Sequence, residues 1–491
     1  MRAGRATCKA GEACSAIGDR MLTVLTLATA LAGAPNVVLI TMDTTRADAI
    51  GAYGEQVPGL LSPRSGVTPT LDGLAAEGVL FERFYAHAPT TLNSHTSLLS
   101  GRDPHEHAVP RNGYPLPPDL KTLPMRLEDE GYDTIAVVAA KALEEEMGLS
   151  TGFRVYDDEM TVKFGPMYQD RAENVTTRAL AAVETHTDDK PLFLWVHYYD
   201  PHGPFRAPEG WFGRFMAPDY DGPYADPMQP LELRPALRRG DAPADDVDQV
   251  AARYLDEVHY MDHHIGVLLD GLRSRGLLDS ALVVATADHG ETLSEEPAYA
   301  YGHGGGVDEG VLRIPLIVWG PTLPIARGRA VSSQQHASGL APTLETLLGL
   351  PVTLGPAGSF AHLVRPGPVW DADGWPSRPT TISFSEATRA RREPRTGWNN
   401  RLMPRGVRAS GFFLQSRPRN STEQYLPPLA VSDRGDRMRS LLRDLLFTWD
   451  LNAPPHREEA MSAETLDALR ALGYIDMPSE PPGDDEEGSP P

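Results

Sequence analysis

Three short stretches of this chain carry side chains that could act together on a metal ion and an ester. Asp43 directly follows the apolar run 36–42, and the pair Asp288-His289 follows the apolar run 281–286 after one alanine. Carboxylate and imidazole groups bind hard or borderline divalent cations. Such a cation can polarise a phosphoryl or sulfuryl oxygen and lower the pKa of a bound hydroxyl group. An Asp-His pair also serves as a cap or an ion-pair partner, so it does not decide the function alone.

The segment 88–102 adds a candidate nucleophile. Its apolar spacing predicts that a helix begins at Thr91 and ends at Gly101. The free backbone N–H groups and the dipole at a helix N-terminus favour an anion, so they would stabilise an ionised threonine and a tetrahedral oxyanion group. The alternative is that Thr90, Thr91 and Asn93 simply cap the helix.

The elements that must position these side chains are short strands buried on both faces. Five apolar, β-branched runs have this character, and helical patterns separate them. The runs cover residues 36–42, 134–140, 192–197, 281–286 and 315–318. Strands that alternate with helices predict an α/β fold with a large, mostly parallel sheet flanked by helices. Ligands of such sheets bind at the carboxyl ends of the strands, where Asp43, Asp288 and His289 stand.

The composition changes along the chain and predicts its domain organisation. We expect the catalytic domain to cover 35–380 and a small C-terminal α+β subdomain to cover 381–477. Within the subdomain, 411–415 is an expected strand and 463–472 an expected helix. Pro, Glu, Asp and Gly dominate 478–491, so this acidic tail is expected to be disordered.

The charge and the cysteines exclude several classes of function. The formal net charge is −22, which repels polyanions, so no nucleic-acid partner is expected and an anionic substrate must be attracted locally. The two cysteines, Cys8 and Cys14, both precede the first predicted strand. The rest of the chain therefore has no thiolate nucleophile, no cysteine zinc site and no disulfide framework.

Residues 1–34 have the features of a secretory signal peptide. Basic residues precede an uncharged stretch from Met21 to Gly33, which ends in small residues. This stretch is too short for a stable membrane anchor, and no later segment is apolar enough, so the mature chain is expected to lack an integral membrane segment. The prediction is a periplasmic or secreted protein. Pro35 is an unfavourable first mature residue, and a misassigned start would instead make the protein cytoplasmic.

Several motifs, in this order, resemble the sulfatase family of the alkaline phosphatase superfamily from Pro35 to about Leu350. The motifs are Asp43 after the first strand, Thr-Pro-Thr-Leu-Asp-Gly-Leu-Ala-Ala-Glu-Gly at 68–78, Ser-Gly-Arg at 100–102, Asp-Pro-His at 200–202, Asp-His-Gly at 288–290, Leu-Arg-Ile-Pro-Leu-Ile at 312–317 and Leu-Ala-Pro-Thr-Leu at 340–344. The resemblance implies a hydrolase of small anionic esters with one divalent cation held by Asp43, Thr91, Asp288 and His289.

The nucleophile segment departs from ordinary sulfatases. Their motif is Cys-x-Pro-x-Arg or Ser-x-Pro-x-Arg, and its first residue is oxidised to formylglycine. Counting back from Gly101 places Thr91 at that position, and His95 replaces the arginine. Threonine cannot become formylglycine, so no such cofactor is expected. Thr44 stands where the family has a second metal aspartate, which favours one ion, with Mn²⁺ or Ca²⁺ ahead of Mg²⁺ or Zn²⁺.

An unmodified threonine nucleophile resembles the phosphodiesterase and phosphoglycerol-transferase branches, and Asn112 matches a phosphate-binding asparagine of phosphonate monoester hydrolases. We therefore expect phosphorus esters, because water can hydrolyse a phospho-threonine, whereas a sulfo-threonine lacks the hemiacetal route that expels sulfate. One alternative is a true sulfuric ester hydrolase without formylglycine. The others are a phosphoglycerol-type transferase, which usually has several membrane spans, and a non-catalytic glycan-binding member.

The resemblance also implies roles for three histidines. His202 or His303 would protonate the leaving oxygen, and a histidine would then act as base for water. His95 would support the nucleophile or contact the substrate beside Asn112. Lys141 and His336 are weaker candidates for a substrate contact and a second metal. No pattern in the sequence indicates an oligomeric state.

Overall fold

A computed structural model describes the larger part of the chain. The described residues are 33–160, 162–164, 167–187, 189–367, 382–387, 404–409, 412–417, 422–428 and 432–451. The expected signal peptide lies outside them except for its last two residues, and the expected helix 463–472 and the tail 478–491 lie outside them entirely. Within these ranges, we find no helix with the length and apolar character needed to cross a membrane.

A sheet of eight strands forms the body of the protein. From edge to edge the strands are β12 (Arg329–Val331), β2 (Val79–Phe81), β11 (Leu316–Trp319), β9 (Ala281–Ala287), β1 (Asn36–Met42), β8 (Leu192–Tyr198), β4 (Asp133–Val137) and β5 (Val155–Asp157). Neighbouring strands run parallel except that β11 is antiparallel to β9 and to β2. The predicted mostly parallel sheet is confirmed, although the strand expected at 134–140 already ends at Val137.

The three central strands end at the same level. Met42 of β1 lies beside Tyr198 of β8 on one side and beside Ala287 of β9 on the other. Every residue of β8 and β9 is buried, as expected of apolar, β-branched runs that are covered on both faces. The residues that follow β1, β8 and β9 therefore emerge together at one edge of the sheet.

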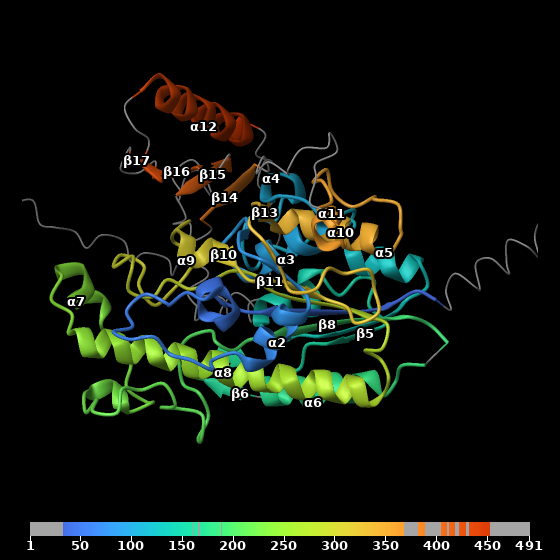
Figure 1. The fold of residues 1–491 in the computed structure, drawn as a ribbon, viewed down its shortest axis with the longest axis horizontal. Coiled ribbons are helices and arrows are strands. Elements are labelled where there is room, and N and C mark those ends of the chain that lie inside the picture. The colour runs from blue at the N-terminus through green and yellow to red at the C-terminus, as the bar shows by residue number, and fades with distance from the viewer. Residues whose placement is uncertain are drawn as a thin grey trace, which may run out of the picture.

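Helices cover both faces of this sheet (Figure 1). One face carries α8 (Ala244–Ser274), α6 (Ala172–Val183) and α2 (Pro69–Glu77), and the other carries α3 (Thr91–Ser100), α5 (Leu123–Asp129) and α10 (Leu340–Leu347). Shorter helices are α4 (Pro104–His107), α7 (Arg234–Arg239), α9 (Glu309–Leu312) and α11 (Ala361–Val364). Asp262 of α8 accepts hydrogen bonds from the first backbone N–H groups of α2, at Thr70 and Leu71, both at 2.9 Å. This carboxylate satisfies donors that a helix start leaves unpaired, and it joins the two helices.

A second, antiparallel sheet lies toward the C-terminus and confirms the expected α+β character of that region. Its strands are β14 (Ser383–Glu386), β15 (Arg405–Ala409), β16 (Phe412–Arg417) and β17 (Thr422–Leu426). Helix α12 (Asp433–Leu451), which the sequence analysis does not predict, packs on this sheet through Leu442, Leu446 and Trp449. Smaller pairings join β10 (Arg313–Ile314), β3 (Phe84–Tyr85) and β13 (Gln335–His336), and also β6 (Val162–Phe164) and β7 (Met167–Gln169).

Candidate active site

The ends of β1 and β9 bring Asp43, Asp288 and His289 together. All three side chains are fully buried. His289 Nε2 lies 3.8 Å from Asp43 Oδ1 and 3.5 Å from Asp288 Oδ2. One ligand atom from each residue lies within 4.8 Å of the other two. Two carboxylates and one imidazole at this spacing can hold a single divalent cation between them.

The ligand atoms of this cluster have no hydrogen-bond partner in the protein. Asp288 Oδ1 accepts hydrogen bonds from the backbone N–H groups of His289 at 2.8 Å and Thr44 at 3.3 Å, but its Oδ2 has no partner. His289 donates its Nδ1–H to the carbonyl of Gly290 at 2.9 Å, which leaves the lone pair on Nε2. Both carboxylate oxygens of Asp43 are buried and unpartnered. Buried polar atoms are seldom unsatisfied, and one cation would satisfy all of these.

The electrostatics of the cluster point the same way. Burial raises the pKa of the Asp43 and Asp288 carboxyl groups. Burial would lower the pKa of His289, but the adjacent carboxylates of Asp288 and Asp43 outweigh it, so this pKa is raised. Two buried carboxylates without a cationic partner are costly, and a divalent ion would remove that cost. The residues present therefore fit a resident metal.

Thr91 stands at the start of α3, as predicted, and its hydroxyl does not cap the helix. Thr90 precedes the helix in an extended conformation, and its side chain makes no capping hydrogen bond. Thr91 Oγ1 is buried and has no partner, while Asn93 donates its side-chain N–H to the carbonyl of Val109 at 2.7 Å. The capping interpretation is therefore wrong. Ser94 Oγ donates to the carbonyl of Asp288 at 2.5 Å and ties the helix to the carboxylate cluster.

Asn112 lies beside the N-terminus of α3. Its Oδ1 accepts a hydrogen bond from the backbone N–H of Leu92 at 2.8 Å. This contact orients the amide, because only the oxygen can accept. The Nδ2 group is then buried without a hydrogen-bond partner. Such a donor is suited to an anionic oxygen.

His202 and His303 lie at the same edge of the sheet. The ring of His303 is 4.5 Å from that of His289 and 5.0 Å from that of His202, measured between centroids. His202 donates its Nδ1–H to the carbonyl of Gly203 at 2.9 Å, and burial lowers its pKa against the attraction of Asp43. His303 Nδ1 lies 3.3 Å from a carboxylate oxygen of Glu291.

Glu291 is a buried group of this site that the sequence analysis does not single out. Burial raises its pKa to about 7. Its place two residues after the Asp288-His289 pair, in Asp288-His-Gly-Glu291, was the available indication. The carboxylate orients His303, because it accepts from the Nδ1–H side of that ring.

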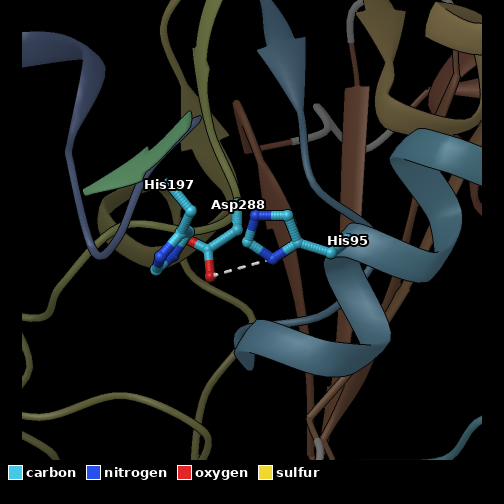
Figure 2. A group of neighbouring side chains, drawn as sticks. All are labelled: His95, His197 and Asp288. Carbon is cyan, nitrogen blue, oxygen red and sulfur yellow. Dashed lines mark ion pairs between the residues drawn. The ribbon is translucent and has the colours of Figure 1, made fainter. Parts of the chain in front are cut away.

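Two further imidazoles lie next to the carboxylates of Asp43 and Asp288. His95 and His197 are fully buried, and Figure 2 shows both rings directed toward Asp288. One ligand atom from each of these three residues also lies within 4.8 Å of the others. Burial lowers the pKa of His95 to about 3 and that of His197 to about 4, so both rings are neutral. His197 escapes notice in the sequence because it is the last residue of an apolar strand pattern.

The two weaker candidates have local partners. Lys141 forms an ion pair with Glu144. His336 Nδ1 lies 2.9 Å from Ser338 Oγ, and its ring packs against that of His87 with centroids 5.2 Å apart. Among the described residues, His336 belongs to neither cluster that could hold a metal.

The fold and this cluster define the protein as an ester hydrolase of the α/β class. Residues 35–350 match the family model named Sulfatase. The chain therefore belongs to the sulfatase family, within the alkaline phosphatase superfamily.

Similar proteins include both sulfatases and phosphonate monoester hydrolases. Human iduronate 2-sulfatase is 25% identical over 414 residues, which cover 72% of this chain and 68% of the relative. The phosphonate monoester hydrolase of Agrobacterium radiobacter has a TM-score of 0.64 at 20% identity, over 86% of this chain and 96% of that one. A 2-O GAG sulfatase has a TM-score of 0.63 at 19% identity, over 87% and 95%. The shared fold covers nearly the whole length of both solved structures.

Proposed function

We propose that this protein hydrolyses phosphorus esters, phosphodiesters or phosphonate monoesters, with unmodified Thr91 as the nucleophile. The observation that carries the proposal is the Thr91 hydroxyl. It is buried and unpartnered, and it stands at the first residue of α3. The dipole and the backbone N–H groups of a helix start favour an anion at this position. A hydroxyl so placed serves attack on an anionic ester rather than packing or capping.

Asp43, Asp288, His289 and Thr91 would hold one divalent cation, with Mn²⁺ or Ca²⁺ favoured and Mg²⁺ or Zn²⁺ also compatible. When bound, such a cation supplies Lewis-acid polarisation of the ester and lowers the pKa of a coordinated hydroxyl group. The unpartnered oxygens of Asp43, the free Oδ2 of Asp288 and the Nε2 of His289 support this assignment.

The other residues then have separate tasks. The Thr91 hydroxyl gives its proton to solvent, and its Oγ1 forms a bond to phosphorus while the ester P–O bond opposite it breaks. Asn112 Nδ2 and the N–H groups of α3 donate to the non-bridging oxygens. His202 or His303 gives a proton to the leaving oxygen.

Water completes the turnover. It attacks phosphorus, the deprotonated histidine takes its proton, and the bond between phosphorus and Thr91 Oγ1 breaks as solvent returns the threonine proton. His95 Nδ1 lies 2.8 Å from the carbonyl oxygen of Thr91, so we assign it support of the nucleophile.

Sulfuric ester hydrolysis is the second candidate. It is favoured by the curated relatives, such as human iduronate 2-sulfatase. The threonine argues for phosphorus, because water can displace a threonine oxygen from phosphorus, whereas a sulfated threonine has no hemiacetal through which to expel sulfate.

The test is a rate comparison on an aryl sulfate, a phosphate monoester, a phosphodiester and a phosphonate monoester, each with added Mn²⁺, Ca²⁺ or Zn²⁺. Thr91→Ala should lower the preferred activity roughly 10³-fold or more, because the covalent route is lost. Thr91→Ser is the matched control and should retain much of it. Dominant sulfate turnover would overturn the phosphorus assignment, and an unchanged rate in Thr91→Ala would overturn the nucleophile.

We also propose a periplasmic or secreted location, which rests on the sequence of residues 1–34. Fusion of these residues to a reporter that is active only after export tests it. The proposal would be contradicted if the reporter stayed inactive and the fusion protein still carried residues 1–34.

A further inference from the structure

The two imidazoles beneath the site each face one of the two carboxylates. His95 Nδ1 lies 3.7 Å from Asp288 Oδ2, and a dashed line marks this ion pair in Figure 2. His197 Nε2 lies 3.6 Å from Asp43 Oδ2. The two rings are 5.0 Å apart between centroids and nearly perpendicular, with 68° between their planes. This geometry permits two roles. The rings either donate N–H groups to the carboxylates or, with Asp288, ligate a second cation.

The hydrogen bonds of His95 decide which of its nitrogens carries the hydrogen. Nδ1 lies 2.8 Å from the carbonyl oxygen of Thr91, which can only accept, so Nδ1 carries the hydrogen. Nε2 lies 3.1 Å from Thr41 Oγ1, which itself accepts the indole N–H of Trp195 at 2.9 Å. The Thr41 hydroxyl can therefore donate to Nε2. The nitrogen of His95 that lies 3.7 Å from Asp288 Oδ2 therefore carries a hydrogen, which it donates to Thr91, and offers no lone pair to a cation there.

The same reasoning applies to His197. The backbone N–H of Ala139 can only donate, and it lies 3.5 Å from His197 Nδ1. Nδ1 is therefore the acceptor of the neutral ring, and Nε2 carries the hydrogen. That N–H group faces the otherwise unpartnered Oδ2 of Asp43.

We propose that His95 and His197 are positioning residues, whose hydrogen-bearing nitrogens lie 3.7 and 3.6 Å from the Asp288 and Asp43 carboxylates and orient them electrostatically, and that neither imidazole ligates a cation. A metal ligand would need its lone pair on the nitrogen that here carries the hydrogen. The inference rests on the proposed metal site. It assigns to these rings the outer contacts that fix the direction of metal-binding carboxylates.

Matched variants separate the donor from the ring. In His197→Gln the side-chain amide nitrogen takes the position of Nε2, and in His95→Asn it takes the position of Nδ1, so both keep an N–H donor. His197→Leu and His95→Leu keep bulk but remove the donor. Loss of such an outer contact typically costs about 10–100-fold in metal affinity. The leucine variants should lose that much, while the amide variants should stay close to wild type.

The experiment is a calorimetric titration of the metal-stripped full chain with Mn²⁺, with Asp43→Asn as the ligand control and circular dichroism to verify folding. We expect one Mn²⁺ per chain in wild type and in all four histidine variants. Two ions in wild type and one in the leucine variants would overturn the inference in favour of ligation. Unchanged affinity in the leucine variants, with binding lost in Asp43→Asn, would overturn the imidazole role alone. No uptake by wild type would overturn the proposed metal site and, with it, this inference.

Discussion

Trp449 of α12 stacks on His105 of α4, with ring centroids 3.5 Å apart and 8° between the planes. His105 Nδ1 lies 2.9 Å from the carbonyl oxygen of Trp449, and Nε2 lies 2.9 Å from Glu386 Oε2. Both ring nitrogens thus face acceptors, an arrangement that suits the imidazolium form. The stack and its two hydrogen bonds join the C-terminal sheet and helix to the catalytic body beside α3.

This contact predicts a pH dependence of stability. Burial lowers the pKa of His105, but Glu386 outweighs it, so the pKa is raised. Because the pKa of His105 is higher in the folded state, its contribution to stability is complete below its pKa in the unfolded chain, about 6.5. The contribution is lost as pH rises through its pKa in the folded protein. Below pH 6, the free energy of unfolding of the wild type should exceed that of His105→Gln by about 1.5–3 kcal/mol. This difference should shrink at higher pH. Denaturant unfolding at several pH values measures it. A difference that grows with pH would contradict the assignment.

Asn112 should act through its amide N–H group. Asn112→Asp keeps the acceptor for the Leu92 N–H but places a negative charge where the substrate's oxygen would lie. We expect roughly a 10²–10³-fold loss of kcat/KM in Asn112→Ala, as for an oxyanion-binding donor, and a larger loss in Asn112→Asp. Steady-state kinetics on the preferred ester measures both. Little loss in Asn112→Asp beside a large loss in Asn112→Ala would indicate that only the contact with Leu92 matters.

The leaving group should distinguish the two histidine candidates. Loss of a general acid costs about 10²–10⁴-fold for a poor leaving group and much less for one that departs without a proton. We expect one of the two variants, His202→Gln or His303→Gln, to lose far more rate on the ester with the poor leaving group than on the other ester. Rates on an alkyl ester and a nitrophenyl ester provide the comparison. If both variants lose the same factor on both esters, neither histidine is the acid.

Chelation should abolish turnover and also lower stability. A ligand that binds only the folded state at about 100 times its Kd stabilises it by about 2.7 kcal/mol. Burial raises the pKa of Asp43 and Asp288, so protons compete with the metal and affinity should fall as pH is lowered. Thermal unfolding with EDTA and with re-added Mn²⁺, at pH 5.5 and 7.5, tests both statements. Identical melting curves with and without metal would contradict them.

The positions of the main functional groups could be predicted because they depend on local patterns. Apolar runs identified the strands, and parallel strands deliver the residues after their carboxyl ends to one edge. Asp43, Asp288 and His289 were found in this way. The start of α3 at Thr91 followed from helical spacing and from Gly101, whose φ of 73° ends the helix at little cost for glycine.

The sequence by itself thus determined the family, the α/β class and the residues at the strand ends, since each depends on order and spacing along the chain. Only the tertiary structure decided the antiparallel placement of β11 and the association of the C-terminal sheet with the catalytic body. It alone placed His197 and Glu291 in the site. A histidine that ends an apolar strand has the same pattern as a core residue, and its role emerges only when strand order brings it beside Asp43 and His95, far away in sequence.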